Sequence, residues 1–392
     1  MAQIYLQCHP SAFTRCVTLQ HTKALLLRST AQKHIVRATS LHWMQRKTRN
    51  FSLPLPPSSR LLRRRFTMDI STVAKGSGRE TFVGQSGMNQ GTGIGALTDL
   101  IKLGVGRLLT WKNRPVYDKL SAIIEDDLLG LVKARVPDLE QKRTAFAEPG
   151  AKPASHAFES ADGKCKGHVA AYKGGKVDWI TTCSFFSESL GFGNLRIDGW
   201  TDRSTRAPNM AVHLCIVFNV LFIYISLPPR ANLLLDDEYN DFVYATPRGE
   251  YRGGPGLSLN DYWVSCIDDK RFKPYFSKFH EVNAFMVAPT TLLYTVKYSK
   301  KSLAAVRDLG IAHVSSWLDL LEGKDDKNGV LLKDIESRDT QAMLLQLDVR
   351  TRQFPFRDPD TKNVANILGL EITDKIIRTL CGDPEDPIWR KR

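Results

Sequence analysis

Two titratable side chains stand inside apolar runs of this 392-residue chain, where a buried proton donor would be expected. Asp348 lies in the run MLLQLDV, and His213 lies in residues 210–226, which contain no Lys, Arg, Asp or Glu. Burial raises the pKa of a carboxylic acid, so that the acid can deliver a proton near neutral pH. A histidine can do so without a large shift, because its ordinary pKa is already near neutral.

Both residues also have a structural interpretation, and pattern alone favours it. Asp348 would then bond to the backbone at a strand end or face solvent, and His213 would be a core histidine with one satisfied hydrogen bond. The run around Asp348 fits either a short strand or the end of a helix.

The apolar stretch around His213 is close in length to the roughly 20 residues that a helix needs to cross a bilayer. However, Val, Ile, Phe and Tyr dominate it, Asn219 lies near its middle, and prolines flank it at 208 and at 228–229. Such residues between proline stops are typical of strands. We therefore predict a buried hairpin of two strands with a tight turn near 218–220, and no transmembrane span.

The rest of the pattern predicts the elements that must position these side chains. Residues 113–138 have the periodicity of an amphipathic helix, with Pro115 in its first turn. Strand-like segments follow from about 165 to 300, and helical patterns return at 301–322 and near 361–380. This order predicts an α/β fold, namely an α/β/α sandwich with a central antiparallel sheet flanked by helices.

The net charge of +14 is concentrated in the first part of the chain. Residues 1–68 hold twelve Lys and Arg and no Asp or Glu; without them, 43 basic residues face 41 acidic ones, a net charge of +2. A basic, acid-free and hydroxyl-rich leader is typical of an organelle transit peptide, and a basic arm that binds nucleic acid is the competing interpretation. We favour the transit peptide and expect no nucleic-acid partner.

Residues 69–112 are glycine-rich and predict a linker with a short helix, followed by one folded domain at 113–392. The glycines at 91, 93 and 95 fit neither the dinucleotide fingerprint nor a P-loop. The seven cysteines form no CxxC pair, which argues against a disulfide framework and against a zinc or iron–sulfur site. We therefore expect no bound metal.

Several motifs occur in an order that resembles one plant enzyme family. The apolar stretch is framed by Ser204–Thr205, Ala207–Pro208–Asn209 and Leu227–Pro228–Pro229–Arg230. The other motifs are YDKLSAIIEDDL at 117–128, KPYFS at 273–277, APT at 288–290, LQLDV at 345–349 and FPF at 354–356. In this ordered set, over about 113–380, the chain resembles red chlorophyll catabolite reductase, a plastid enzyme.

The resemblance implies a fold like that of the ferredoxin-dependent bilin reductases, with a single catalytic domain of that kind at 113–392. It implies reduction of red chlorophyll catabolite, an open-chain tetrapyrrole, to primary fluorescent chlorophyll catabolite in chlorophyll breakdown. The enzyme would be an oxidoreductase acting on a tetrapyrrole C=C bond, with no bound cofactor and with reduced ferredoxin as the electron donor. We expect it in the chloroplast, in the stroma or associated with the thylakoid, with other chlorophyll-breakdown enzymes as further partners; a mitochondrial location is the less favoured alternative.

The resemblance also suggests catalytic residues. Asp348 matches the functional aspartate of the family, so we predict Asp348 and His213 as the catalytic pair. His213 stands where the family carries a glutamate, and Ser226 stands where the family tends to carry an aspartate before Leu-Pro-Pro-Arg. These departures put the usual substrate in doubt, and they motivate an alternative of another class: a catalytically inactive bilin-binding or scaffold protein of the same fold.

Binding residues complete the prediction. Asn209, Arg230 and Phe356 are candidates for substrate binding. Asn209 and Arg230 could instead fix the ends of the hairpin, which is the interpretation we favour for Asn209, and core packing is the default interpretation of Phe356. An acidic ferredoxin requires a positive surface near the pocket. We predict this docking surface at Lys270, Arg271, Lys273 and Lys278, for which an ordinary solvated surface is the alternative.

Overall fold

The computed structural model describes residues 110–389 except 137, 149, 218, 252–253 and 277–286. The predictions for the leader, residues 1–68, and for residues 69–109 of the linker lie outside this part of the chain. Among the helices it contains, none is long and apolar enough to cross a membrane.

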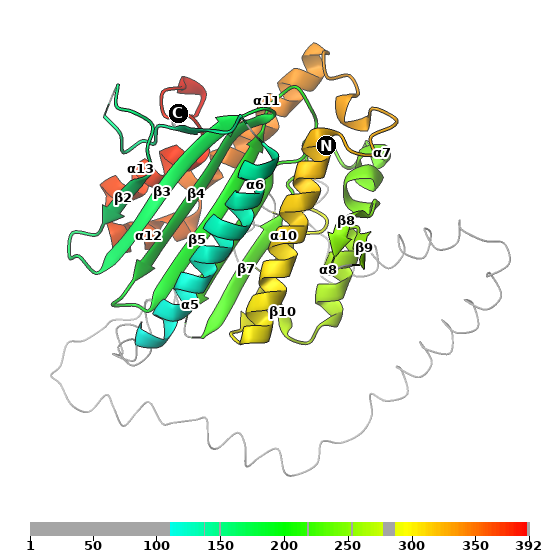
Figure 1. The fold of residues 1–392 in the computed structure, drawn as a ribbon. Helices are drawn as coiled ribbons and strands as arrows, with labels where there is room; N and C mark the ends of the chain where they lie inside the picture. The colour runs from blue at the N-terminus through cyan, green and yellow to red at the C-terminus, as the bar shows by residue number, and fades with distance from the viewer. Residues whose placement is uncertain are drawn as a thin grey trace, which may run out of the picture. The chain divides into compact units, whose positions relative to one another are not determined.

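A nine-stranded antiparallel sheet forms the centre of the fold (Figure 1). Its strands are β1 (Glu140–Lys142), β2 (His156–Glu159), β3 (Cys165–Gly174), β4 (Val177–Ser187), β5 (Phe192–Thr201), β6 (Met210–Val217), β7 (Val220–Ser226), β10 (Phe272–Pro274) and β11 (Leu292–Lys297). The spatial order is β1-β3-β4-β5-β6-β7-β11-β10, with β2 beside β3. Strands β3 to β7 are neighbours both in sequence and in space, as short connections between strands require.

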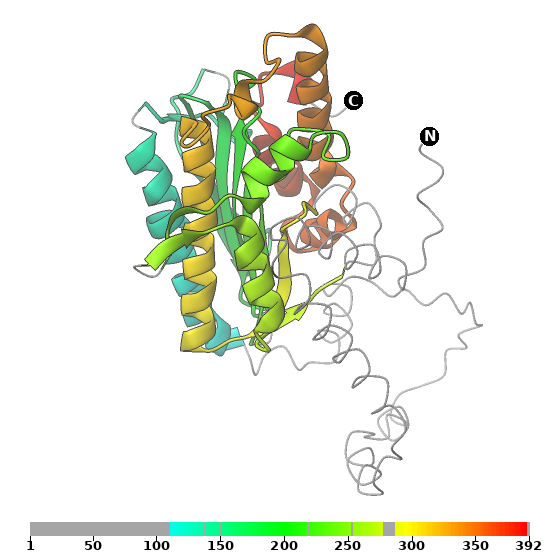
Figure 2. The same ribbon diagram turned by 90° about the vertical axis from the view of Figure 1, so that its right-hand side faces the viewer.

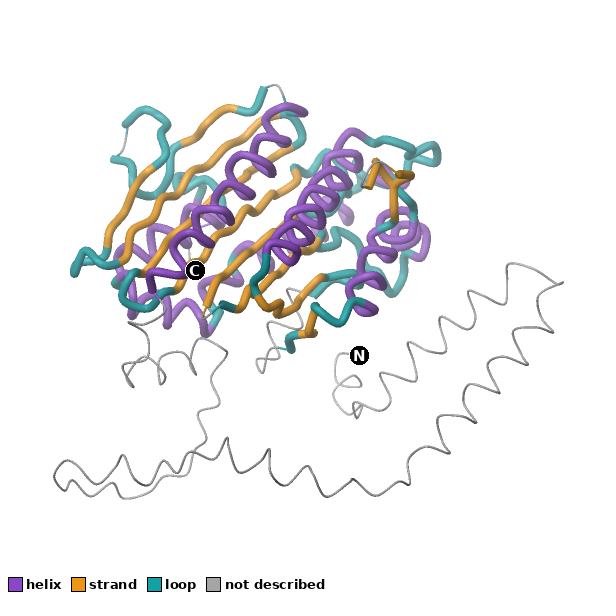
Figure 3. The backbone as a smooth tube through the Cα atoms, turned by 60° about the horizontal axis from the view of Figure 1, so that its bottom comes forward, coloured by secondary structure: helices purple, strands orange, loops and turns teal. Residues whose placement is uncertain are grey.

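Helices cover both faces of this sheet, as Figure 2 shows edge-on. One face carries α5 (Thr110–Ala122), the π-helical η4 (Ile123–Leu128), α6 (Leu129–Arg135) and α10 (Lys300–Glu322), which lie over the strands and run roughly along them in Figure 3. The other face carries α11 (Arg338–Arg352), the 3-10 turn η7 (Phe354–Phe356), α12 (Pro359–Leu368) and α13 (Leu370–Cys381). The predicted α/β/α sandwich with a central antiparallel sheet is therefore confirmed.

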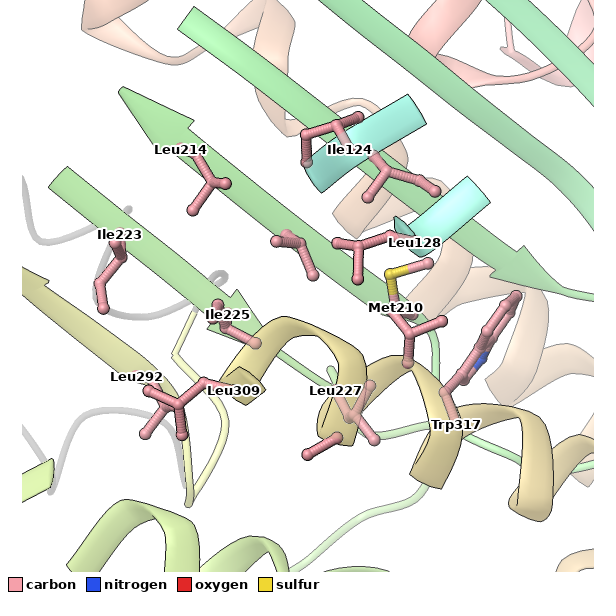
Figure 4. Close-up of a cluster of buried hydrophobic side chains, with 14 of the residues drawn as sticks. Ile124, Leu128, Met210, Leu214, Ile223, Ile225, Leu227, Leu292, Leu309 and Trp317 are labelled. Atoms are coloured by element: carbon pink, nitrogen blue, oxygen red, sulfur yellow. The ribbon is translucent and has the colours of Figure 1, made fainter. Parts of the chain in front are cut away.

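The largest hydrophobic core lies between the sheet and the layer of α5 and α10. Alternate residues of β5, β6 and β7 point into it, because successive side chains of a strand face opposite sides. Leu214 and Ile223 belong to this core together with Leu128 and Leu309 of the helical layer (Figure 4). Close approach is required at Gly199 of β5, where a Cβ atom would lie 2.8 Å from the ring of Trp317.

The predicted hairpin is confirmed. Strands β6 and β7 pair from Ala211 with Ser226 to Val217 with Val220. Asn219, in the turn, has a φ of 66°, a left-handed conformation that asparagine tolerates better than most residues.

The structure decides between the two alternatives for the run MLLQLDV, which lies in a helix. It belongs to α11, where the period of 3.6 turns Leu344, Asp348 and Arg352 to one buried face. Two other local expectations were wrong. Pro115 lies inside α5 rather than in its first turn. The helix expected near 361–380 is divided into α12 and α13 at Gly369, whose φ is 89°.

The edge of the sheet near β10 also holds elements that the sequence pattern did not predict. They are α7 (Asp237–Asn240), the π-helical η5 (Asp241–Ala245), the hairpin of β8 (Arg248–Tyr251) and β9 (Gly254–Leu257), and α8 (Leu259–Asp268). Three-residue 3-10 turns occur at η6 (Val330–Leu332) and η8 (Pro387–Trp389). Turn residues are frequent between residues 237 and 268, and they interrupt the short periodic patterns from which helices and strands are predicted.

One buried histidine makes the stability of this fold dependent on pH. His313 of α10 is 1% exposed, its Nδ1 lies 2.8 Å from the Leu309 carbonyl oxygen, and its Nε2 has no partner among the described residues. Burial lowers its pKa from 6.5 to about 4. The unfolded chain therefore binds this proton more readily, and stability should fall by about 3 kcal/mol as the pH decreases from about 6.5 to about 4.

Urea unfolding at several pH values checks this expectation. In His313→Gln, whose amide can still donate to the Leu309 carbonyl, the free energy of unfolding should depend less on pH in that window than in the wild type. If the free energy of unfolding changed equally with pH in the two proteins, the role of His313 in this pH dependence would be contradicted.

Candidate active site

A cavity of about 260 Å³ lies between the sheet and the layer of α12 and α13. The strand residues that point away from the main core line its floor, and mostly apolar helix residues line its other wall. The floor residues include Cys183, Phe185, Phe192, Asn194, Arg196, His213, Cys215, Val217, Phe222 and Tyr224. The opposite wall includes Phe354, Pro355, Asp358, Val364, Ile376 and Leu380, and Tyr275 lines the cavity from beyond β10. An apolar, aromatic cavity with a few polar groups is the usual form of a site for an organic ligand.

Three polar residues are linked on the floor of this cavity. The register of β5 and β6 places Arg196 directly opposite His213. Asp198, two residues further along β5, accepts from both: its Oδ1 lies 2.8 Å from His213 Nε2, and its Oδ2 lies 2.6 Å from Arg196 Nε. Asp198 is 1% exposed, whereas the side chains of Arg196 and His213 are each 19% exposed.

The charges of this group determine which nitrogen of His213 carries a hydrogen. Burial alone would raise the pKa of Asp198, but the positive Arg196 and the ring of His213 outweigh it and hold the pKa well below its ordinary value. An ionised carboxylate only accepts hydrogen bonds, so His213 Nε2 is the donor and Nδ1 is the nitrogen that gains or loses a proton. Burial, together with the Arg196 charge, lowers the pKa of His213, so the free site holds a neutral imidazole near pH 7.

Tyr224 of β7 completes the polar part of the floor. Its ring centroid lies 4.9 Å from that of His213, with the two planes at 45°. Burial raises the pKa of its phenol above the ordinary value, so it remains a neutral hydroxyl. The floor thus combines an oriented imidazole, a guanidinium and a phenol, which suits proton transfer to a bound conjugated molecule.

The sequence therefore predicted His213 as a site residue, but it did not predict its partners Asp198 and Arg196. Asp198 and Arg196 lie in the segment NLRIDGW, where two charged residues alternate with Leu195 and Ile197. That alternation places both charges on the face opposite the core, and it was the available signal. Their contact with His213 depends on the pairing of β5 with β6, which pattern alone does not give.

Asp348 lies at another place in the fold. Its carboxylate receives Arg230 Nη2 at 2.9 Å, Arg230 Nε at 3.2 Å and Asn209 Nδ2 at 3.1 Å. Arg230 Nη1 also donates to the carbonyl oxygens of Asp202 and Thr205. We call Asn209, Arg230 and Asp348 the clasp, because they join the two ends of the β6–β7 hairpin to α11.

Asp348 of the clasp and His213 line different cavities. Asp348 lines a smaller cavity of about 70 Å³ together with Asp178, Arg352 and Trp389, whereas His213 lines the large one. Neither Asn209 nor Arg230 is among the described residues that line the large cavity. Of the five predicted catalytic and substrate-binding residues, the structure thus unites Asn209, Arg230 and Asp348 and separates them from His213.

Phe356 lies beside the large cavity rather than on its wall. It packs with the buried cluster of Ile377, Cys381 and Trp389. Its neighbours Phe354 and Pro355, in the same 3-10 turn η7, line the cavity instead. Of the two interpretations given for Phe356, this environment corresponds to core packing.

The predicted docking residues lie at one edge of the sheet. Lys270 and Arg271 are exposed in the connection from α8 to β10, Lys273 is exposed in β10 itself, and Arg271 pairs with Asp269. Tyr275, two residues after Lys273, lines the large cavity. The basic segment 270–273 therefore leads to the rim of that cavity, and Lys278 lies outside the described residues.

Together the sheet and its covering helices define the class of fold: an antiparallel sheet between two helical layers. Solved structures of this class include phytochromobilin synthase from tomato in complex with biliverdin. Its similarity to this chain has a TM-score of 0.53 at 11% identity, and covers 69% of this chain and 84% of the tomato chain. No protein-family model matches the sequence, and no curated protein matches it.

The clasp gives a prediction for stability. Arg230→Met should destabilise the protein by about 3–5 kcal/mol, because it leaves the buried Asp348 carboxylate without its ionic partner. Arg307→Met is a matched control: Arg307 forms an exposed ion pair with Asp127, and its loss should cost at most about 1 kcal/mol. If urea unfolding showed that the two variants lose the same free energy of unfolding, the importance of the clasp would be contradicted.

Proposed function

We propose that this protein is an oxidoreductase that reduces an open-chain tetrapyrrole with electrons from ferredoxin. The observation that carries the proposal is the pair of His213 and Asp198 on the floor of an aromatic cavity, in a fold shared with a solved protein that binds biliverdin. The sequence motifs around this hairpin support red chlorophyll catabolite as the substrate and primary fluorescent chlorophyll catabolite as the product. The basic leader supports a location in the chloroplast.

The reaction adds two electrons and two protons across a C=C bond of the tetrapyrrole. If the electrons arrive singly, the first one leaves a negative charge on the conjugated system. A negative charge in the cavity raises the pKa of a nearby histidine, because the imidazolium is then stabilised. His213 would take up a proton at Nδ1 and deliver it to the reduced substrate, and Asp198 would hold the ring in the required orientation.

In this assignment, Asp198 takes the place of the glutamate that the similar family carries at the position of His213. The family carries a glutamate where this chain has His213, but Asp198 of the neighbouring strand places a carboxylate 2.8 Å from the ring. The imidazole would donate the proton and the carboxylate would act through it. Asp348, whose oxygens are engaged by Arg230 and Asn209, would maintain the hairpin in this scheme.

Electron delivery would use the basic segment beside the cavity. A ferredoxin is acidic, so an encounter near Lys270, Arg271 and Lys273 would be steered by charge. The aromatic residues between that surface and His213 include Tyr275 and Phe222, whose ring centroids lie 5.7 Å apart. The donor would thus reach the rim of the cavity without entering it.

The proton-transfer role is tested by His213→Gln and Asp198→Asn. In an anaerobic assay with reduced ferredoxin and red chlorophyll catabolite, His213→Gln should lower kcat by about 10²- to 10⁴-fold, since a general acid contributes that much. Asp198→Asn should lower it less and leave substrate affinity nearly unchanged. The control is His168→Gln, which alters a half-buried histidine that contacts Glu125, in the helical layer on the opposite face of the sheet.

The same assay separates the enzyme from a binding protein. Tetrapyrrole that binds to the wild type but is never bleached would reject the reductase and leave the bilin-binding alternative. A His213→Gln variant with full activity would remove His213 from the mechanism.

Ionic strength tests the docking surface. The kcat/KM for ferredoxin should fall as salt rises from about 0.01 M to about 0.15 M, because the Debye length shortens from about 30 Å to about 8 Å. Replacing both Lys270 and Lys273 by Glu should reduce the rate at low salt and weaken this dependence. A rate indifferent to salt in the wild type would count against docking at this surface.

A further inference from the structure

Arg196 presents unused hydrogen-bond donors to the large cavity. Its Nε donates to Asp198 Oδ2 at 2.6 Å. Within the described part of the chain, neither of its terminal nitrogens, Nη1 and Nη2, has a hydrogen-bond partner, and the side chain is 19% exposed at a position that lines the cavity. A guanidinium fork with up to four free N–H groups in an apolar cavity is costly unless a ligand or water accepts from it.

The surrounding charges select the kind of acceptor. Asp198 already neutralises the guanidinium, and Asp358 lines the same cavity near enough to influence Arg196 electrostatically. A carboxylate bound at the fork would bring a further negative charge close to these two, which is unfavourable. A neutral carbonyl oxygen accepts the same hydrogen bonds without that repulsion.

We propose that the Nη1 and Nη2 groups of Arg196 bind a neutral, conjugated carbonyl oxygen of the substrate, such as the lactam carbonyl of a linear tetrapyrrole. His213 lies directly opposite Arg196 across the β5–β6 pair, so the bound carbonyl lies beside the proton donor. The inference rests on the proposed function for its substrate class, and it adds the group that orients the substrate.

This contact also affects the first reduction step. A one-electron carrier of the ferredoxin class supplies one electron to the conjugated system, and part of the resulting charge resides on the carbonyl oxygen. Donors already aimed at that oxygen stabilise the charge without rearrangement. Arg196 keeps its proton; the two protons that complete the C=C reduction are delivered separately, and the second electron comes from a second carrier molecule.

Binding without any reductant tests this assignment independently of turnover. Biliverdin and its dimethyl ester, whose two propionates are blocked, are titrated by absorbance into the wild type, Arg196→Lys and the control Arg307→Lys. Lysine retains the charge beside Asp198 but lacks the fork. Arg196→Lys should weaken the binding of both ligands by about tenfold to a hundredfold, and Arg307→Lys should change neither.

Infrared difference spectra of bound biliverdin with an ¹⁸O-labelled lactam provide a readout on the wild type itself, whether or not the variant folds. The C=O stretch should lie lower in the complex than in free biliverdin and should rise again in Arg196→Lys. Unchanged affinity in Arg196→Lys, an effect confined to the free acid, an unshifted stretch, or a wild type that binds neither ligand would each overturn the proposal. If the wild type and its variants bind as expected but the wild type shows no reductase activity, only the proposed function is rejected.

Discussion

The pairing of β5 with β6 is the constraint on which the rest of the site depends. It sets Arg196 opposite His213 and brings His213 within hydrogen-bond distance of Asp198, which already holds Arg196 from two residues along the same strand. The same pairing points Leu195 and Leu214 into the main core. Since a slip of one residue would exchange the two faces of a strand, burial of the core and assembly of the polar group are secured by a single register.

The hairpin of β6 and β7 connects β5 to the rest of the sheet, because β6 pairs with β5 and β7 pairs with β11. At its closed end, Asn219 adopts the left-handed conformation of the turn. At its open end, the clasp ties Asn209 and Arg230 to Asp348 of α11. The two residues that the sequence suggested as catalytic thus have different positions. His213 lies on the cavity floor, and Asp348 holds the ends of the strands that form this floor.

Much of the fold could be predicted from the sequence, because alternation and proline stops report directly on strands. The hairpin at 210–226 and the helix at 301–322 are examples. Asp348 shows the limit: MLLQLDV is short enough to fit a strand or a helix, and only the packing of Leu344 and Arg352 beside it distinguishes the two. Asp198 shows another, since its partners come from a second strand and local pattern carries no information on register. The leader at 1–68 and Lys278 lie outside the described residues, so those expectations remain predictions.

The separation of the clasp from the cavity floor has a consequence for how such a site can change over time. Arg230 and Asp348 fix the strand ends at the open end of the hairpin, and His213 takes no part in that network. A substitution at position 213 can therefore change the polar group that faces the cavity while the strand register is retained, provided that the neighbouring strand supplies a matching partner as Asp198 does for His213.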